Sequence, residues 1–277
     1  MRVAAVQLRS GVDMARNISA MTKHVEAAAA DGAIYIQTPE MTGLLQKDRA
    51  ALMAAVHPDS GDPVFAAAAS LAKRLGVWLH IGSTPILLPD GRCANRAALF
   101  APDGTRRATY DKIHMFDVDL DNGESWRESA IYAPGETSCV TDIDTIRLGF
   151  AICYDVRFAD IFRRQALAGA NVLTAPAAFT RQTGEAHWHI LMRARAIENG
   201  AYMIAAAQGG DHEDGRQTYG HSIIVDPWGA VIAEKNDDEP GHIIADIDVA
   251  KSAAARAKIP NLKNARAFDL QASGMGQ

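Results

Sequence analysis

Short apolar segments of strand length alternate with longer helix-like segments along the chain, and this order limits the possible fold more than any other feature of the sequence. The apolar runs predict strands at residues 2–8, 33–37, 77–82, 95–100, 145–152, 171–175, 202–207, 222–225, 231–234 and 242–247. Helices are expected at residues 17–30, 63–75, 160–167 and 185–198. Because strand–helix–strand order occurs in both halves of the chain, we predict an α/β fold.

Turn and breaker residues mark several boundaries of these elements. Pro63 opens the second helix and Gly76 closes it, and the turn at residues 102–104 predicts a β-hairpin whose second arm ends at Lys112. Residues 113–132 have no clear period and are rich in polar residues and glycine, so we expect a long loop, a feature that tends to be functional. With 277 residues, 48% of them hydrophobic, and no low-complexity linker, the chain is expected to form one domain over residues 1–277.

Cys153 ends one of the predicted core strands. Residues 149–158 read GFAICYDVRF, so a run of small and apolar residues stops at a thiol that polar and charged groups follow. A strand fixes the direction of the side chain at its carboxyl end, which a nucleophile for covalent catalysis requires. The alternative is an inert core cysteine, because free cysteine is among the most buried residue types.

Two further chemical groups follow predicted strands in the same way. Glu40 comes after the apolar run at residues 33–37, and Lys112 lies where the second arm of the hairpin ends. In α/β proteins, sites form outside the carboxyl ends of strands, so this carboxylate and this ammonium are expected to meet Cys153 in one crevice. The alternatives are a loop carboxylate for Glu40 and a solvated cation for Lys112.

A thiol, a carboxylate and an ammonium together suit attack on an amide carbon. A thiol is mostly protonated at neutral pH and needs a base, and we expect partial burial to raise the pKa of Glu40 enough for it to take the proton. Lys112 would then face the developing oxyanion, and the backbone N–H of Tyr154 would be a second donor.

These residues carry a resemblance to a known family. Glu40, residues 111–117 (DKIHMFD) and residues 153–158 (CYDVRF) resemble the Glu-Lys-Cys signature of the nitrilase superfamily of carbon–nitrogen hydrolases. Further segments resemble the deaminated glutathione amidase branch, with omega-amidase as its near relative: residues 178–188, 193–199, 205–208 and 219–229.

The resemblance implies a four-layer α-β-β-α sandwich, a thioester acyl-enzyme, no cofactor and no metal. It also implies a fourth site residue after the lysine loop, and Glu128 in the sequence WRES matches it. A second carboxylate beside Lys112 would hold the ammonium in place, whereas the alternative is a loop acid at the surface. The implied substrate is deaminated glutathione, followed by 2-oxoglutaramate and then other aliphatic amides. Residues 159–160 and Ala177 differ from the residues that many relatives carry, which leaves the substrate open.

Several residues are candidates for substrate binding. Arg157 and Arg181 follow strand ends near the expected pocket, so each is a candidate for bidentate pairing with a substrate carboxylate. For Arg157 an ion pair behind the site is an equal alternative. Tyr154 and Thr180 are the other candidates, through hydrogen bonds at the oxyanion and at the rim.

Two other readings stay open at this stage. His114, His187 or His221 could serve Cys153 in a Cys-His arrangement like that of papain-type enzymes, although the sequence places no orienting group. Alternatively, the chain could be a non-catalytic assembly or binding protein on the same fold.

Charge and cysteine content limit the partners of the chain. Lysine and arginine number 28 against 33 acidic residues, with no basic block, which argues against nucleic acid and membrane surfaces as partners. Three cysteines without metal-type spacing suit a reducing compartment, and no segment has the length of a signal peptide or membrane span, so a cytoplasmic protein is expected. Residues 258–277 are expected to pack against another subunit of a homo-oligomer.

Overall fold

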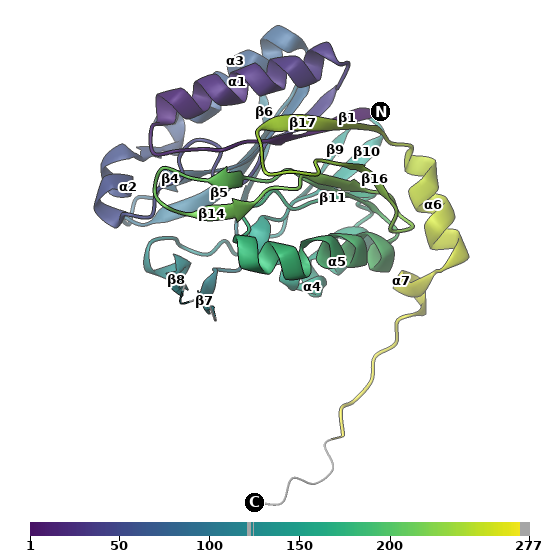
Figure 1. Cartoon of the computed structure of the whole chain (residues 1–277). Helices are drawn as coiled ribbons and strands as arrows, with labels where there is room; N and C mark the ends of the chain where they lie inside the picture. Colours follow the sequence, from purple (N-terminus) through teal and green to yellow (C-terminus); the bar gives the residue numbers. More distant parts are fainter. Residues whose placement is uncertain (121–122, 124, 272–277) are drawn as a thin grey trace, which may run out of the picture.

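The computed structural model describes residues 1–120, 123 and 125–271, and its helices and strands form four layers (Figure 1). Two β-sheets lie face to face, and helices cover the outer side of each sheet. This arrangement is the predicted α-β-β-α sandwich.

Sheet 1 comes from the amino-terminal part of the chain, closed at one edge by a strand from the carboxyl-terminal part. In spatial order it contains β17 (Gly241–Asp246), β1 (Arg2–Gln7), β2 (Tyr35–Gln37), β4 (Trp78–Leu87), β5 (Cys93–Phe100) and β6 (Arg106–Asp111), with β3 (His57–Pro58) beside β4. The central strands β1, β2 and β4 are parallel, whereas β17, β5 and β6 pair antiparallel with their neighbours. The carboxyl ends of β2 and β6 are the strand ends that matter for the site.

Sheet 2 repeats this plan in the second half of the chain. In spatial order it contains β16 (Val231–Glu234), β15 (Ile223–Val225), β12 (Tyr202–Ala205), β11 (Val172–Thr174), β10 (Ile146–Gly149) and β9 (Val140–Ile143). Its central strands β10, β11 and β12 are parallel. Two small hairpins lie outside both sheets: β7 (Asp117–Asp119) with β8 (Ser125–Arg127), and β13 (Gly209–Asp211) with β14 (Gln217–Tyr219).

The outer layers are amphipathic helices. Helices α1 (Met14–Ala30) and α3 (Pro63–Leu75) cover sheet 1, and α4 (Ala159–Leu167) and α5 (Arg181–Asn199) cover sheet 2 (Figure 1). The remaining helices are α2 (Arg49–Ala55), α6 (Val249–Lys258) and α7 (Asn261–Asn264), with 3-10 turns at Asp59–Gly61, Glu128–Ala130 and Cys153–Arg157. Beyond α7 the described residues extend away from the body as an exposed segment.

Strand β1 shows why the sheets stack in this way. Val3 and Ala5 point into the core between the two sheets, whereas Ala4 and Val6 point into the core beneath α1 and α3. Side chains of a strand alternate between its two faces, so a strand that is apolar at every position fits a sheet buried on both sides. The continuous apolar strands of the sequence therefore match the sandwich.

Most of the expected elements are present, and the structure adds several short ones that were not expected, including β9, β13, β14 and α7. Helix α3 begins at Pro63 behind the N-cap Asp62 and ends before Gly76, whose φ of 67° lies in the left-handed region that glycine adopts easily, as predicted. Residues 113–132, which were expected to form a long loop, contain the hairpin β7–β8 and the turn Glu128–Ala130. Strands of three residues are too short to show a hydrophobic period. Helices α2 and α6 were also not expected.

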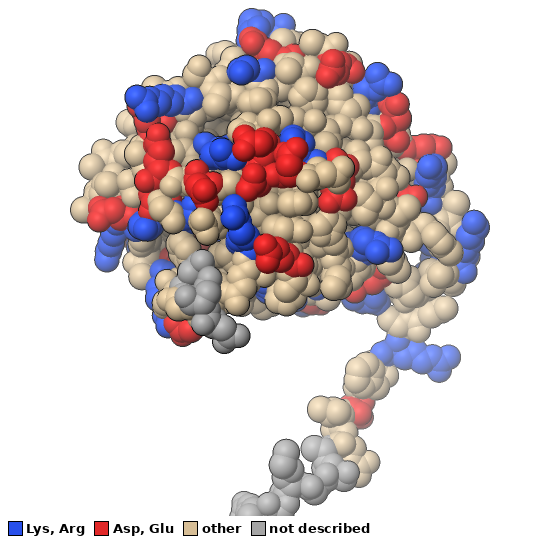
Figure 2. Space-filling model, in the orientation of Figure 1, with Lys and Arg blue, Asp and Glu red and all other residues tan. Residues whose placement is uncertain are grey.

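The surface mixes both signs of charge. On the face shown in Figure 2, lysine and arginine side chains are interspersed with aspartate and glutamate, as expected from a sequence with no basic block. Among the helices of the described residues, none combines the length and the apolar composition that a membrane span would need.

Candidate active site

Both sheets contribute to the candidate site. Glu40 follows β2 and Lys112 follows β6, so sheet 1 delivers the carboxylate and the ammonium. Cys153 comes from sheet 2, but it lies beyond the end of β10 and is the first residue of the 3-10 turn Cys153–Arg157. The strand predicted over residues 145–152 ends earlier, at Gly149, and a tight turn after it presents the thiol.

The backbone of Cys153 has an unusual conformation. Its φ is +48°, in the left-handed region that residues other than glycine rarely adopt. The backbone N–H of Cys153 donates to the carbonyl of Pro176 at 2.9 Å, which ties the turn to the segment after β11. A strained backbone held by its surroundings is typical of functional turns, because it fixes the direction of one side chain.

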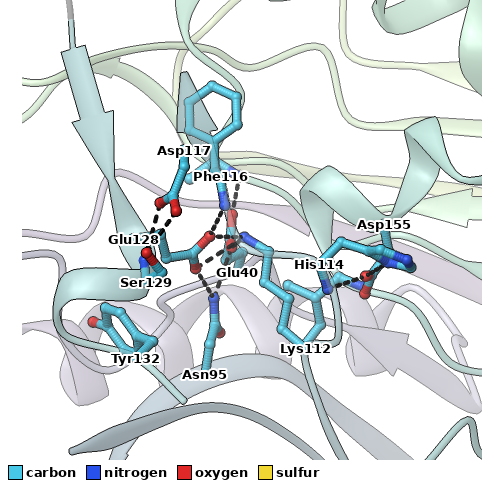
Figure 3. Close-up of polar contacts among 12 residues, drawn as sticks. Glu40, Asn95, Lys112, His114, Phe116, Asp117, Glu128, Ser129, Tyr132 and Asp155 are labelled. Atoms are coloured by element: carbon cyan, nitrogen blue, oxygen red, sulfur yellow. Dashed lines mark hydrogen bonds and ion pairs between the residues drawn. The ribbon is translucent and has the colours of Figure 1, made fainter. Parts of the chain in front are cut away.

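Lys112 lies between two carboxylates. Its Nζ donates to Oε1 of Glu40 at 2.9 Å and to both carboxylate oxygens of Glu128, at 3.0 and 2.8 Å (Figure 3). The side chain is only 2% exposed, so the reading of Lys112 as a solvated cation does not hold. Burial acts to lower the pKa of Lys112, but the charges of Glu128 and Glu40 outweigh it and raise the pKa well above its ordinary value. Lys112 is therefore a fixed positive charge.

Asn95 was not among the residues predicted from the sequence. It connects the carboxylates of Glu40 and Glu128. Its Nδ2 donates to Oε1 of Glu40 at 2.9 Å and to Oε1 of Glu128 at 3.1 Å (Figure 3). Asn95 lies on β5 and is completely buried. The only signal in the sequence was an amide in the otherwise mostly apolar run CANRAALF, which does not reveal its partners.

The two carboxylate oxygens of Glu40 have different partners. Oε1 accepts from Lys112 and Asn95, whereas Oε2 accepts the backbone N–H of Ala178 at 2.9 Å. Burial pushes the pKa of Glu40 upward, but the charge and hydrogen bond of Lys112, with bonds from Cys153 and Asn95, bring the pKa below its ordinary value. The expectation that burial raises the pKa of Glu40 is thus wrong, because the buried ammonium outweighs desolvation.

The pKa of the Cys153 thiol shifts in the opposite direction from the pKa of Glu40. Burial and the negative charge of Glu40 raise the pKa of Cys153 well above its ordinary value, and the charge of Lys112 only partly offsets them. The resting site therefore holds a protonated thiol beside an ionised carboxylate. That is the arrangement from which a base removes a proton as the nucleophile attacks.

Glu128 is positioned by the hairpin β7–β8 and the turn that follows it. The backbone N–H of Phe116 donates to Oε2 of Glu128 at 2.7 Å. The hydroxyl and backbone N–H of Ser129 donate to Asp117, which ties the turn to the start of β7 (Figure 3). With its side chain 10% exposed and both oxygens on Lys112, Glu128 is not the surface acid of the alternative reading.

Asp155 joins the turn of Cys153 to the loop of Lys112. Its completely buried carboxylate accepts the backbone N–H of Ile152 at 2.9 Å and the hydroxyl of Tyr110 at 2.7 Å. It also accepts the backbone N–H of His114 at 3.0 Å and contacts Nδ1 of the same residue at 2.7 Å (Figure 3). One carboxylate thus fixes the residue before Cys153 relative to the residues on both sides of Lys112.

The site opens into a cavity of about 560 Å³. Its lining includes four side chains from the candidate site and three of the predicted substrate-binding residues: Glu40, Lys112, Glu128, Cys153, Tyr154, Arg157 and Thr180. Further lining residues that the sequence did not suggest include Lys47, Phe116, Trp126, Tyr132 and Arg216. The volume suits a small organic substrate.

The four predicted substrate-binding residues differ in their surroundings. Arg157 lies over the rings of Tyr154 and Phe179, at 5.9 and 5.5 Å from Cζ to the ring centres, and contacts Nδ1 of His187. Thr180 is buried and caps α5, with its hydroxyl bonded to Thr183.

Arg181 does not line the cavity: its guanidinium donates to Asp238 at 3.0 Å, and we leave it out of the proposed site.

The histidine alternative has no support in the geometry. His114 is bonded to Asp155, and Nδ1 of His221 contacts the carbonyl of Tyr219. No histidine is among the described residues that line the cavity with Cys153. Within the same part of the chain, no group of three or more His, Cys, Asp or Glu side chains is arranged to hold a metal ion.

Comparison with known proteins gives a consistent assignment. The carbon-nitrogen hydrolase family model matches residues 2–257. The chain is 38% identical to a deaminated glutathione amidase from Yersinia enterocolitica, over 95% of this chain and 92% of that protein. It is 33% identical to the human omega-amidase NIT2, over 99% of this chain and 98% of that protein.

Solved structures agree with these relatives. The NitFhit protein of C. elegans superposes with a TM-score of 0.86 at 32% identity, over 96% of this chain and 65% of that longer chain. An amidase from Nesterenkonia sp. AN1, solved with acrylamide added to its active-site cysteine, superposes with a TM-score of 0.78 at 26% identity, over 94% of this chain and 98% of that chain. The chain described here belongs to the carbon-nitrogen hydrolase family of the nitrilase superfamily and is a hydrolase of carbon–nitrogen bonds.

Proposed function

We propose that the chain is a cysteine-dependent amidase in which Cys153 is the nucleophile, Glu40 the proton carrier, Lys112 the oxyanion partner and Glu128 the carboxylate that holds Lys112. The observation that carries this proposal is the geometry of Glu40. Its Oε1 accepts from Lys112 and Asn95, whereas Oε2 accepts the backbone N–H of Ala178, so Oε2 has the greater capacity to take the proton of the thiol.

In the first half of the reaction, Sγ of Cys153 attacks the amide carbonyl while Glu40 takes the thiol proton. The carbonyl oxygen becomes negative and faces the ammonium of Lys112 and the backbone N–H of Tyr154. Glu40 then gives its proton to the amine, the carbon–nitrogen bond breaks, and a thioester remains on Cys153.

In the second half, water enters and Glu40 takes one of its protons as the oxygen attacks the thioester. Collapse of the tetrahedral intermediate breaks the carbon–sulfur bond, and the proton returns from Glu40 to the sulfur. The acid product leaves, and the site regains its resting protonation state. Lys112 keeps its charge throughout, because its raised pKa prevents it from losing a proton to either carboxylate.

We propose deaminated glutathione as the preferred substrate, with 2-oxoglutarate and cysteinylglycine as products. Relatives with that name reach 38% and 36% identity over 95% and 94% of this chain. The second candidate is 2-oxoglutaramate, because the chain is also 33% identical to the human omega-amidase NIT2. A broader aliphatic amidase is the third, and a non-catalytic assembly protein would have no need of the buried Glu40–Lys112–Glu128 arrangement.

The two leading substrates release different amines. Purified enzyme would be given each compound, and cysteinylglycine, ammonia and 2-oxoglutarate would be followed, with Cys153→Ala as the inactive control. Faster Cys153-dependent release of cysteinylglycine supports the first assignment, and faster release of ammonia supports the second. Hydrolysis that survives in Cys153→Ala would contradict the proposed nucleophile.

The domain organisation, the assembly state and the cellular location are also proposals. We infer one domain over residues 1–277 that assembles into a homo-oligomer in the cytoplasm and takes a small amide as its ligand. The exposed segment after α7 supports a partner subunit, because Phe268 and Leu270 are 87% and 90% exposed. Light scattering of the full chain and of a chain ending at Ala265 would test this, with a smaller assembly expected for the shorter chain.

A further inference from the structure

The cavity lining combines a buried group of charges with cations from other segments of the chain. At the floor, the carboxylates of Glu40 and Glu128 surround the single ammonium of Lys112. Lys47 and Arg216 also line the cavity, and they come from the loop after β2 and from the turn between β13 and β14. Cations that line the cavity outside the Glu40–Lys112–Glu128 group favour a substrate that has an anionic group besides the amide that reacts.

Arg216 is held in place and still has donors to offer. Its guanidinium carbon lies 4.6 Å from the ring centre of Trp126. Its backbone N–H donates to Oδ1 of Asp214 at 2.9 Å, and Oδ2 of Asp214 lies 3.4 Å from Nη2 of the guanidinium. The Nε atom of Arg216 is buried and, among the described residues, has no acceptor. An arginine that is stacked and has an unused donor is suited to bind a carboxylate, because little side-chain freedom is lost on binding.

Lys47 lies beside Arg216. Its Nζ is 3.2 Å from where a Cβ on Gly215 would be, so the ammonium reaches the turn that carries Arg216. Gly215 has a φ of +82°, a backbone conformation that glycine adopts easily. No described carboxylate pairs with Lys47, whereas Arg127, another cation of the lining, is engaged by Asp119. Lys47 thus has no carboxylate partner among the described residues, and it lies beside Arg216, which shares its charge with Asp214 but keeps an Nε donor without an acceptor.

We propose that Lys47 and Arg216 form a subsite for a substrate carboxylate in the cavity that Cys153 also lines, and that this subsite selects anionic amides over neutral ones. This inference deepens the proposed amidase function and rests on it for the identity of the substrate. Lys112 cannot supply this selection, because its ammonium is already bonded to Glu40 and Glu128.

The test uses alkylation of Cys153, which needs no amide hydrolysis. N-iodoacetylglycine and its neutral relative N-iodoacetylglycinamide have the same reactive carbon and differ only in a distant carboxylate. In both reactions the thiolate sulfur displaces iodide, and the thiol proton passes to Glu40. Rate constants for each reagent would be measured with the full chain, and the modified residue identified by peptide mass spectrometry.

For the wild type we expect the anionic reagent to react faster than the neutral one, with a ratio that falls as salt is added. Arg216→Gln should lower this ratio about 10-fold, since hydrogen bonds to charged groups are the stronger class, and Lys47→Gln about 3-fold, since its ammonium is exposed. Arg216→Lys, which keeps the charge but loses the planar stacking, should fall between the wild type and Arg216→Gln. Lys23→Gln on α1 is the charge-matched control and should leave the ratio unchanged.

Two results would overturn the subsite: equal rates for both reagents in the wild type, or variants that slow both reagents by the same factor. The second result would mean that Arg216 only supports the fold of the hairpin. If the charge preference is present but no amide is hydrolysed, the proposed function fails and the subsite stands. If amides are hydrolysed without any charge preference, only the subsite fails.

Discussion

Nζ of Lys112 lies 2.9 Å from Oε1 of Glu40, and the two side chains are 2% and 5% exposed, so the pair is removed from water. Glu128 completes the group from the other side at 2.8 Å. A buried ammonium with two carboxylates is stable only as a whole, because each charge compensates the desolvation of another. Loss of the central cation would leave two buried carboxylates side by side.

We therefore expect Lys112→Met to reverse the pH dependence that this buried site gives to the free energy of unfolding. In the wild type the lowered pKa of Glu40 contributes stability that is present above about pH 4.5 and is lost as the pH falls through the folded value. Without the ammonium, the carboxyl groups would bind protons more tightly in the folded chain, so stability would fall as the pH rises. We expect a loss of about 3–5 kcal/mol at pH 8 and a smaller loss at pH 4.5 to 5. Urea unfolding at high and low pH, with Lys23→Met as control, measures the two losses of stability. An equal loss at high and low pH would contradict the role given to the buried carboxylates.

The activity is expected to be constant over a wide pH range. Glu40 must be ionised to take the thiol proton, and its lowered pKa places the acid limb of kcat/KM below the ordinary glutamate value of 4.5. The thiol must keep its proton for later transfer to the amine, and its raised pKa places the basic limb above the ordinary thiol value of 9.0. A profile of kcat/KM from pH 4 to 10 tests this, and a limb between pH 6 and 7 would assign the proton transfer to another group.

Asp155→Asn is expected to loosen the site without changing any group that touches substrate. The amide has one acceptor oxygen in place of two, so at least two of the donors from Ile152, Tyr110 and His114 lose their partner. We expect a loss of about 2–4 kcal/mol in stability, and a fall in kcat of about 10-fold or more because the Cys153 turn moves relative to Lys112. Asp160→Asn on the exposed face of α4 is the control. Lower stability with unchanged kcat would show that Asp155 only supports the fold.

Asp62 provides a test of pH-dependent stability away from the site. Its Oδ1 caps α3 by accepting the N–H of Phe65, while burial raises the pKa of its carboxyl to about 6. A carboxyl with a raised folded pKa costs stability as the pH rises from about 4 to 6. Asp62→Asn keeps the cap and removes this cost, so it should gain about 2–3 kcal/mol relative to the wild type between pH 4 and pH 7. The exposed N-cap variant Asp48→Asn is the matched control. If the curves of unfolding free energy against pH were parallel for Asp62→Asn and the wild type, the raised pKa of Asp62 would be contradicted.

The sequence predicted the site residues that follow strands. Glu40 and Lys112 lie just after β2 and β6, where the edge of a sheet brings such groups together, and the apolar run before Cys153 marked its position. Asn95 could not be predicted, because a buried amide on a strand gives no sign of which carboxylates it will meet.

Contacts between loops that are distant in the chain could also not be predicted from the sequence. Arg181 had the position of a substrate clamp, but Asp238, far along the chain, takes its guanidinium. Lys47 and Arg216 had no local signal, and the turn at Gly215 brings them together. The direction of the Glu40 pKa depended on the balance between burial and a buried cation, which needs the distances in space.

The division of the site between two sheets has a consequence for folding. Sheet 1 carries the base and the cation, and sheet 2 carries the thiol, so neither sheet alone has the complete set of groups. On the proposed mechanism, a chain that has formed only one sheet lacks a group that amide hydrolysis needs. During refolding, hydrolytic activity should therefore appear only with the docking of the two sheets, when the thiol comes within reach of Glu40.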